Sequence, residues 1–185
     1  MADRETFDPL TQGVAAERAA MLRVDHAGEV GAVRIYAGQR AVMGEHVPAA
    51  RVIARMAGQE ERHRARLERM LVARGVRPTL LGPLWDRAGH ALGVATALIS
   101  PEAAMACTAA IETEIDRHYG KQLEALGDGA ADPELASTIA EFRADEVEHR
   151  DTAIAAGAER APGYPLLSGA IRLGCRFAIA LSKRV

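Results

Sequence analysis

Aromatic residues, cysteines and long apolar runs are scarce in this chain, and each scarcity narrows the class of protein. Only 4% of its 185 residues are aromatic and two are cysteine, although 49% are hydrophobic, with alanine supplying much of that share. Cys107 and Cys175 have no paired metal-ligand spacing and lie in apolar stretches, which predicts small buried side chains in a reducing compartment. Small apolar residues in place of aromatics favour closely packed helices.

Other absences exclude further functions. No run of alternating β-branched residues lies between turn residues, so the predicted fold class is all-α. The net charge is −2 with acids and bases interspersed, which gives no general attraction to nucleic acid. No Gly-x-Gly-x-x-Gly fingerprint for dinucleotide binding is present. A reduced nicotinamide cofactor, if the protein uses one, would therefore bind in an unfamiliar way or act through a separate reductase. Residues 1–13 lack an apolar stretch, which predicts neither a signal nor a transit peptide.

Capping signals divide the chain into two pairs of long helices. The first pair is predicted over Arg18–Met43 and Pro48–Arg74, the second from Ser100-Pro101-Glu102 to near Gly127 and from Asp132-Pro133-Glu134 onward. A break at Pro162–Pro165 precedes a last helix. These boundaries predict a single domain over residues 1–185. It comprises a four-helix bundle, an N-terminal extension (1–17), an apolar insert between the helix pairs (80–99) and an amphipathic C-terminal helix (166–184).

Each helix pair carries one Glu-x-x-His motif and one lone glutamate. The motifs are Glu60-x-x-His63 and Glu146-x-x-His149, and the lone glutamates are Glu29 and Glu112. Glu29 lies about 14 residues before the first turn and Glu60 about 12 after it, which is roughly 21 Å down and 18 Å back at 1.5 Å per residue. The second pair repeats this spacing. The six side chains are therefore predicted to converge in one layer, in the pattern of a carboxylate-bridged di-iron site.

A single glutamate in an alanine-rich helix is usually a solvated side chain, so the six residues must be judged together. Glu29 and Glu112 lie in stretches poor in charge. A buried carboxylate without a partner is costly, whereas four glutamates and two histidines around two Fe²⁺ ions balance charge and satisfy every ligand. Carboxylate-rich ligation stabilises oxidised iron, and one imidazole per metal leaves coordination positions open.

The insert and the tail are suited to a membrane surface. Ala88–Ile99 contains no charged residue apart from a protonated His90, yet it is far shorter than the roughly 20 residues that span a bilayer. Arg172, Arg176 and Lys183 fall within about 40° on a helical wheel at 100° per residue, a basic stripe suited to an anionic leaflet. The alternative, that both segments pack on the bundle or in an oligomer interface, stays open.

Several strings of residues resemble one family, the demethoxyubiquinone hydroxylases of ubiquinone biosynthesis, from about Leu22 to the C-terminus. The strings are Arg23-Val24-Asp25-His26-Ala27-Gly28-Glu29, Arg34-Ile35-Tyr36-Ala37-Gly38-Gln39, Arg77-Pro78-Thr79, Pro83-Leu84-Trp85, Ala103-Ala104-Met105-Ala106-Cys107-Thr108, His118-Tyr119 and Gly174-Cys175-Arg176. The family's six ligand positions map onto Glu29, Glu60, His63, Glu112, Glu146 and His149 without a departure.

The resemblance implies a ferritin-like di-iron monooxygenase that uses two irons, O₂ and an external reductant, with NADH as a candidate. Its substrate would be a polyprenyl quinone or quinol, hydroxylated on the ring, and the enzyme would be peripheral on the cytoplasmic side of the bacterial inner membrane. An accessory lipid-binding protein, a reductase and a second copy of the chain are candidate partners, and nucleic acid is not. A ferritin- or rubrerythrin-like iron-storage or peroxide-scavenging protein would use the same ligands, and a lipid-carrying bundle without chemistry or a tRNA-modifying hydroxylase are further alternatives.

Three other residues have weaker predicted roles. Tyr119 is seven positions after Glu112 on the same helix face, where it would act as a hydrogen-bond donor or electron relay, or as an ordinary core tyrosine. Asp145 and Gln59 each precede a ligand glutamate. Asp145 is predicted to accept the second N–H of a ligand histidine on a facing helix, the usual way in which such ligands are oriented.

Overall fold

The computed structural model describes residues 9–44 and 47–184 and is helical throughout its regular elements. They are α1 (Pro9–Met43), α2 (Pro48–Ala73), α3 (Gly82–Ile99), α4 (Pro101–Leu126), α5 (Pro133–Ala155), the 3₁₀ turn η1 (Ala158–Arg160) and α6 (Tyr164–Ser182). The all-α prediction is confirmed for the described chain. The predictions about residues 1–8 lie outside the described residues.

Local signals explain most of the helix boundaries. The Ser100 side chain accepts a hydrogen bond from the Ala103 backbone N–H (3.0 Å), and Asp132 does the same for Leu135 (3.2 Å). In both helices a proline follows the cap, where its missing N–H costs nothing. The predicted start of the first helix at Arg18 is wrong, because α1 begins at Pro9. Proline is tolerated in a first turn, and the alanines that follow support a helix, so part of the predicted extension belongs to α1.

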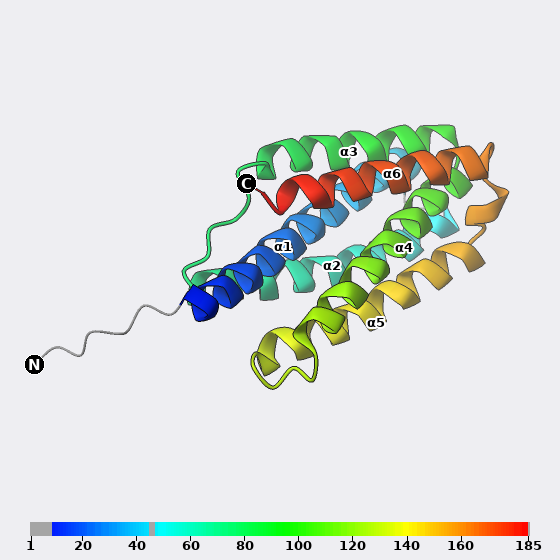
Figure 1. Ribbon diagram of the computed structural model, residues 1–185. Coiled ribbons are helices and arrows are strands. Elements are labelled where there is room, and N and C mark those ends of the chain that lie inside the picture. The colour runs from blue at the N-terminus through cyan, green and yellow to red at the C-terminus, as the bar shows by residue number, and fades with distance from the viewer. Residues whose placement is uncertain (1–8, 45–46, 185) are drawn as a thin grey trace, which may run out of the picture.

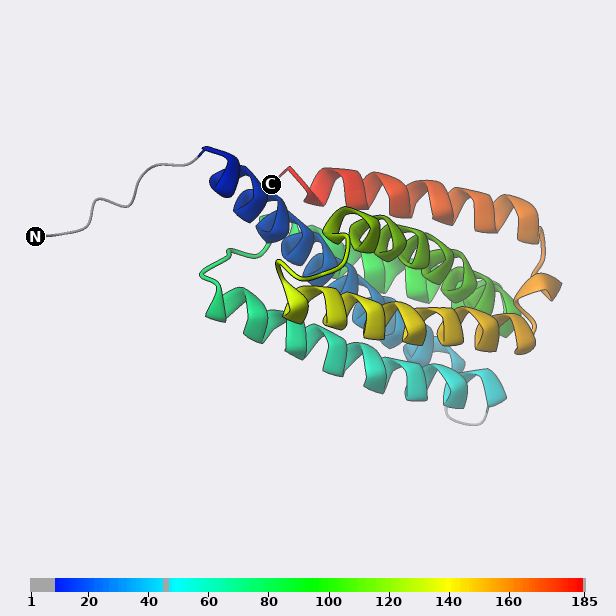
Figure 2. The same ribbon diagram turned by 60° about the horizontal axis from the view of Figure 1, so that its bottom comes forward.

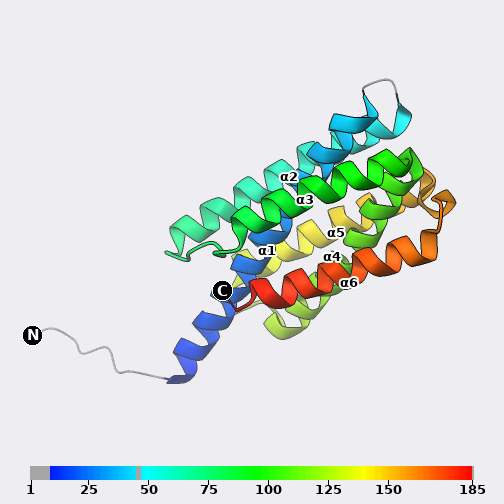
Figure 3. The same ribbon diagram turned by 90° about the horizontal axis from the view of Figure 1, so that it is seen from above.

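The six helices form three layers of two (Figures 1 and 2). The pair α1 and α4 lies in the middle, α2 and α5 cover one side, and α3 and α6 cover the other. Seen from above, α3 and α6 lie over the bundle (Figure 3). The start of α3 meets the end of α6, where the Trp85 indole N–H donates to Ser182 Oγ (2.9 Å).

The insert packs on protein along one face. α3 crosses α1 so closely that a Cβ on Gly38 would collide with the His90 carbonyl oxygen, and one on Gly93 would collide with that of Ile35. Only glycine permits this approach of two backbones. The opposite face of α3 exposes Leu98 and Ile99. One face of the insert therefore packs on the bundle and the other is exposed and apolar, and the role of the insert at a membrane stays a prediction.

Two apolar clusters fill the bundle on either side of the predicted ligand layer. One contains Ile35, Ile53 and Ala153, and the other contains Leu22, Leu67 and Ile139. On α1, α2 and α5 the ligand positions fall between the members of the two clusters. The layer that holds the ligands is thus enclosed above and below by close-packed side chains.

Candidate metal centre

The six predicted ligand residues lie together in the middle of the bundle. α1 supplies one of them, α4 one, and α2 and α5 two each. None is more than 5% exposed: Glu29, Glu60, His63, Glu112, Glu146 and His149. The motif positions i and i+3 share one face of a helix, which brings each glutamate and its histidine to the same side.

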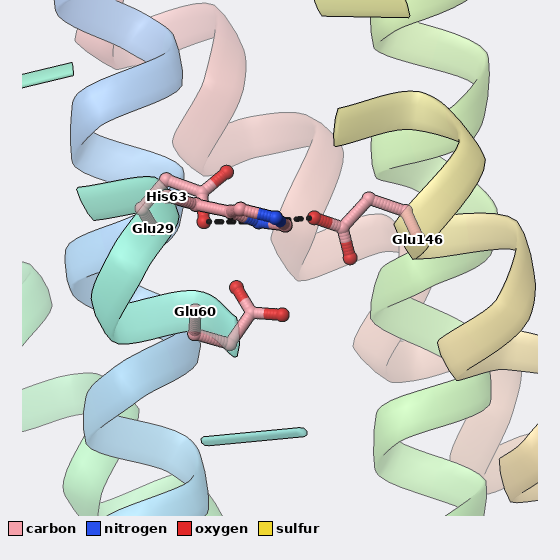
Figure 4. A group of neighbouring side chains, drawn as sticks. All are labelled: Glu29, Glu60, His63 and Glu146. Atoms are coloured by element: carbon pink, nitrogen blue, oxygen red, sulfur yellow. Dashed lines mark ion pairs between the residues drawn. The ribbon is translucent and has the colours of Figure 1, made fainter. Parts of the chain in front are cut away.

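The six residues form two overlapping groups. Ligand atoms of Glu29, Glu60, His63 and Glu146 lie within 4.8 Å of one another, and those of Glu60, Glu112, Glu146 and His149 do the same. Figure 4 shows the first group, with His63 Nδ1 3.5 Å from both Glu29 Oε2 and Glu146 Oε1. Glu60 and Glu146 belong to both groups. The two groups could hold two neighbouring metal ions, with two carboxylates common to both.

Both histidines point one nitrogen inward and the other at a fixed partner. Nδ1 of His149 lies 2.9 Å from Glu60 Oε1, and Nε2 of His149 lies 3.1 Å from Gln59 Oε1. Nε2 of His63 lies 2.9 Å from Asp145 Oδ2, and its ring stacks on Phe142 with centroids 3.9 Å apart. The predicted contact between Asp145 and a facing histidine is present. Its effect on metal binding stays a prediction.

Two tyrosines form hydrogen bonds with the lone glutamates. Tyr119 O–H donates to Glu29 Oε1, and Tyr36 O–H donates to Glu112 Oε1, both at 2.7 Å. Each tyrosine lies seven residues after the glutamate on its own helix and bonds the glutamate of the other helix. The same spacing that singles out Tyr119 would have found Tyr36, which had no predicted role.

Burial dominates the electrostatics of the layer, and repulsion among its carboxylates adds to the effect of burial. Burial, then the nearby carboxylates, raises the pKa of Glu60 well above its ordinary value. Burial likewise raises the pKa of Glu112, and raises that of Glu146 to about 7. Burial alone would lower the pKa of His63, but the Glu146 and Glu29 carboxylates, each 3.5 Å from Nδ1, outweigh it and raise that pKa to about 10. Burial lowers the pKa of His149.

These residues fit metal cations. Glu29 Oε2 and His63 Nδ1 are buried and have no hydrogen-bond partner among the described residues, although each faces the other ligand atoms. Such unpaired groups are costly unless something absent from the protein chain satisfies them. Two divalent cations would neutralise the carboxylates and use both atoms. Oxygen and imidazole nitrogen donors suit iron, and this ligand count on four helices is that of di-iron carboxylate proteins.

A cavity of about 490 Å³ lies beside the layer, between the middle helices and the pair α3 and α6. Its wall is mainly aliphatic, and its polar side chains include those of Tyr119, His118, Asp25 and Ser182. Tyr119 therefore touches both the cavity and a ligand glutamate, whereas Tyr36 is not among the lining residues. Cys175 also lines the cavity and is only partly buried, so the prediction of two buried cysteines holds for Cys107 alone.

The predicted basic stripe on the last helix faces the protein at two of its three positions. Arg172 Nε lies 2.7 Å from Glu114 Oε1, and Arg176 Nη1 lies 3.9 Å from the same atom. The Glu114 side chain is 1% exposed on α4. Two of the three cations thus face a buried carboxylate. A buried charge without a partner is far more costly than an unpaired charge on the surface, which favours this pairing. These contacts of Arg172 and Arg176 with Glu114 join α6 to α4.

The raised pKa values predict how the metal-free protein responds to pH. Glu146 goes from an ordinary value of 4.5 to about 7 and His63 from 6.5 to about 10. A raised pKa adds stability below the ordinary value, and this stability is lost as the pH rises through the raised value. The melting temperature of metal-free protein should fall as the pH rises from 5 to 8. Loaded protein should change less, because cations replace the protons.

Scanning calorimetry on both forms would measure this effect. Glu146→Gln should flatten the part of the fall between about pH 4.5 and 7, since it removes the carboxyl that titrates there. A melting temperature of the metal-free parent that rises over this interval would contradict the prediction.

Comparison with known proteins agrees with the geometry. The family model described as "Ubiquinone biosynthesis protein COQ7" matches residues 16–182. A Rhodospirillum rubrum protein named 3-demethoxyubiquinol 3-hydroxylase is 53% identical over 164 residues, covering 89% of this chain and 76% of the relative. The mitochondrial NADPH-dependent 3-demethoxyubiquinone 3-hydroxylase of Rattus norvegicus is 49% identical over 166 residues with the same coverage. The 5-demethoxyubiquinone hydroxylase of Saccharomyces cerevisiae is 42% identical over 195 residues, covering 96% and 84%. This chain belongs to the COQ7 family of ubiquinone biosynthesis proteins.

Proposed function

We propose that this protein is a di-iron monooxygenase that hydroxylates the ring of a polyprenylated demethoxyubiquinol (2-polyprenyl-3-methyl-6-methoxy-1,4-benzoquinol). The observation that carries the proposal is the contact of Tyr119 with both the ligand layer and the apolar cavity. Family membership and the names of its relatives, which are demethoxyubiquinone or demethoxyubiquinol hydroxylases, supply the substrate class.

The protein's part in the reaction is to hold metals and exclude water. Glu29 and His63 would hold one iron, Glu112 and His149 the other, and Glu60 and Glu146 would bridge them. Iron bound by these residues would supply the activation of O₂, of which one atom would enter the ring and the other would leave as water. Two electrons must come from an external reductant; the rat relative is named as NADPH-dependent, and a reduced nicotinamide is the donor class proposed here.

The apolar cavity fits a hydrophobic ring and part of its tail. Its aliphatic wall excludes water, and its volume lies in the range typical of small-molecule sites. Tyr119 fixes Glu29 through its hydrogen bond at the point where the ring would approach the metals. An iron-storage or peroxide-scavenging protein has no use for such a cavity, so the structure gives that alternative no support.

We place the enzyme at the cytoplasmic face of the bacterial inner membrane, as a peripheral protein. Leu166, Leu173 and Phe177 on α6 are 83%, 64% and 66% exposed, and Leu98 on α3 is 70% exposed. Exposed apolar residues on two adjoining helices over a cavity suit a lipid interface. α6 is the only helix of the described chain long and apolar enough to cross a membrane. Its ion pair with Glu114 supports a position on the protein instead.

Iron content and product formation test the proposal directly. Purified protein should hold about two irons per chain, measured by metal analysis and Mössbauer spectroscopy. Glu146→Ala and His149→Ala should lose most hydroxylation while keeping their helical content by circular dichroism, since the two apolar clusters remain. A single mononuclear iron, or hydroxylation by either variant at the parental rate, would exclude the di-iron mechanism.

Asp145 is expected to hold His63 in place for the metal. Asp145→Ala should lower iron affinity or turnover by about 10- to 100-fold, the usual loss when such a partner is removed. Asp151→Ala is the matched control, because Asp151 lies on the same helix and pairs only with the partly exposed Arg150 among the described residues. A twofold effect or less from Asp145→Ala, measured by iron titration and turnover, would rule out the role.

The exposed apolar side chains of α6 should carry membrane binding. Leu173→Gln with Phe177→Gln should reduce co-sedimentation with lipid vesicles by about tenfold or more, since burial of each side chain contributes about 1.5–3 kcal/mol. Val72→Gln is the control, because Val72 is 78% exposed on α2 in the opposite layer. Undiminished vesicle binding by the double variant, or an equal loss in the control, would locate the membrane surface elsewhere.

A further inference from the structure

A small polar cluster interrupts the aliphatic wall of the cavity. It consists of Asp25 on α1 and of His118 and Gln122 on α4, which are 2%, 7% and 4% exposed. Asp25 and His118 line the cavity. None of the three belongs to the ligand layer. Buried polar groups in an otherwise apolar wall are costly, so their presence calls for a polar partner.

Hydrogen bonds use only one oxygen of Asp25. Gln122 Nε2 donates to Asp25 Oδ1 (2.8 Å), and His118 Nε2 lies 3.1 Å from the same oxygen. Asp25 Oδ2 is buried and has no hydrogen-bond partner among the described residues. Burial raises the pKa of Asp25, and the contacts of His118 and Gln122 with Oδ1 offset part of that rise. The carboxylate thus retains one free acceptor atom.

The cluster adjoins the ligand layer. Asp25 precedes Glu29 by four residues, which is about 6 Å along the axis of α1. His118 precedes Tyr119, whose hydroxyl bonds Glu29. A flat ring held by Asp25 would therefore lie beside Tyr119, next to the metal ligands. The remainder of the cavity is apolar enough for a tail.

We infer that Asp25 Oδ2 accepts a hydrogen bond from a ring hydroxyl of the quinol form of the substrate. This inference rests on the proposed function and adds a site that selects the oxidation state of the ring. A quinol oxygen carries a hydrogen to donate, whereas a quinone oxygen can only accept and faces a carboxylate that also only accepts. Asp25 is in this way a specificity-determining residue that binds the reduced ring and disfavours the oxidised one.

Asp25→Asn changes this preference in a predictable direction. The amide oxygen of the new side chain should take the place of Oδ1, where the Gln122 Nε2 donor requires an acceptor. Its NH₂ group then replaces Oδ2 and can donate to a quinone oxygen but not accept from a quinol hydroxyl. The variant should bind a quinol about tenfold more weakly, as expected for a lost bond to a charged group. Its affinity for the quinone should be unchanged or higher.

Fluorescence of Trp85 provides the measurement. It is the only tryptophan of the chain and lines the cavity, so its quenching reports a bound ring without any turnover. A short-tailed methoxy-methyl-benzoquinol would be titrated into iron-loaded protein in the ferrous state under nitrogen, and the matching quinone into the ferric protein. Neither probe can then exchange electrons with the iron, and each variant is compared with the parent in the same state.

Controls separate selection from folding. Asp86→Asn makes the same chemical change at a partly exposed pair with Arg34 outside the cavity, and should leave both affinities unchanged. If Asp25→Asn does not fold, Gln122→Met removes one donor to Oδ1 and should weaken quinol binding several-fold while sparing the quinone. Equal loss of both probes in the variant that folds, or no loss of either, would overturn the inference.

The outcomes distinguish the inference from the proposed function. Hydroxylated product from the parent, with Asp25→Asn binding quinol as tightly as the parent, overturns the inference and leaves the function intact. Failure of the iron-loaded parent to form product, with the selective loss of quinol binding still observed, overturns the monooxygenase proposal and supports the site.

Discussion

The burial of four mutually repelling carboxylates is the constraint on which the rest of this structure depends. Glu29, Glu60, Glu112 and Glu146 lie in one layer and are almost completely buried. Each isolated charge there would cost far more than a helix pair gains by packing. The layer is stable only with protons or cations among its oxygens. Two histidines, two tyrosines and two outer partners hold those oxygens in position, and apolar clusters above and below keep water away.

The contacts of the layer repeat across the two helix pairs, and the differences between the halves have consequences. Tyr119 bonds Glu29 and Tyr36 bonds Glu112, but only Tyr119 lines the cavity. His63 has a carboxylate partner, whereas His149 has the Gln59 amide. The half that contains Glu29 and His63 therefore combines the charged outer partner with access to the cavity. A bundle of two similar helix pairs thus has a cavity beside only one half of its buried layer.

The outer pair of helices, α3 and α6, supplies much of the apolar wall of the cavity. The backbones of α3 and α1 lie in close contact at glycines, and an ion pair between Arg172 and Glu114 joins α6 to α4. Together they cover a space that the four-helix bundle alone would leave open to solvent. Their outward faces carry exposed leucines and a phenylalanine. The same two helices thus form one wall of the cavity and carry exposed apolar side chains on their outward faces, as the proposed membrane-associated function requires.

The sequence by itself determined the all-α class, the caps at Ser100 and Asp132, and the convergence of the ligand residues. These follow from spacing along single helices, where 1.5 Å per residue and a 3.6-residue turn fix which side chains share a level and a face. Apart from the contact of Asp145 with a facing histidine, which the sequence predicted, tertiary structure alone decided the partners between helices. Arg172 and Arg176 share a stripe on the wheel, yet only packing shows that the stripe faces Glu114. Tyr36, Asp25 and the cavity likewise depend on how α1, α4 and α6 lie side by side, because contacts between distant segments arise from packing that no local spacing specifies.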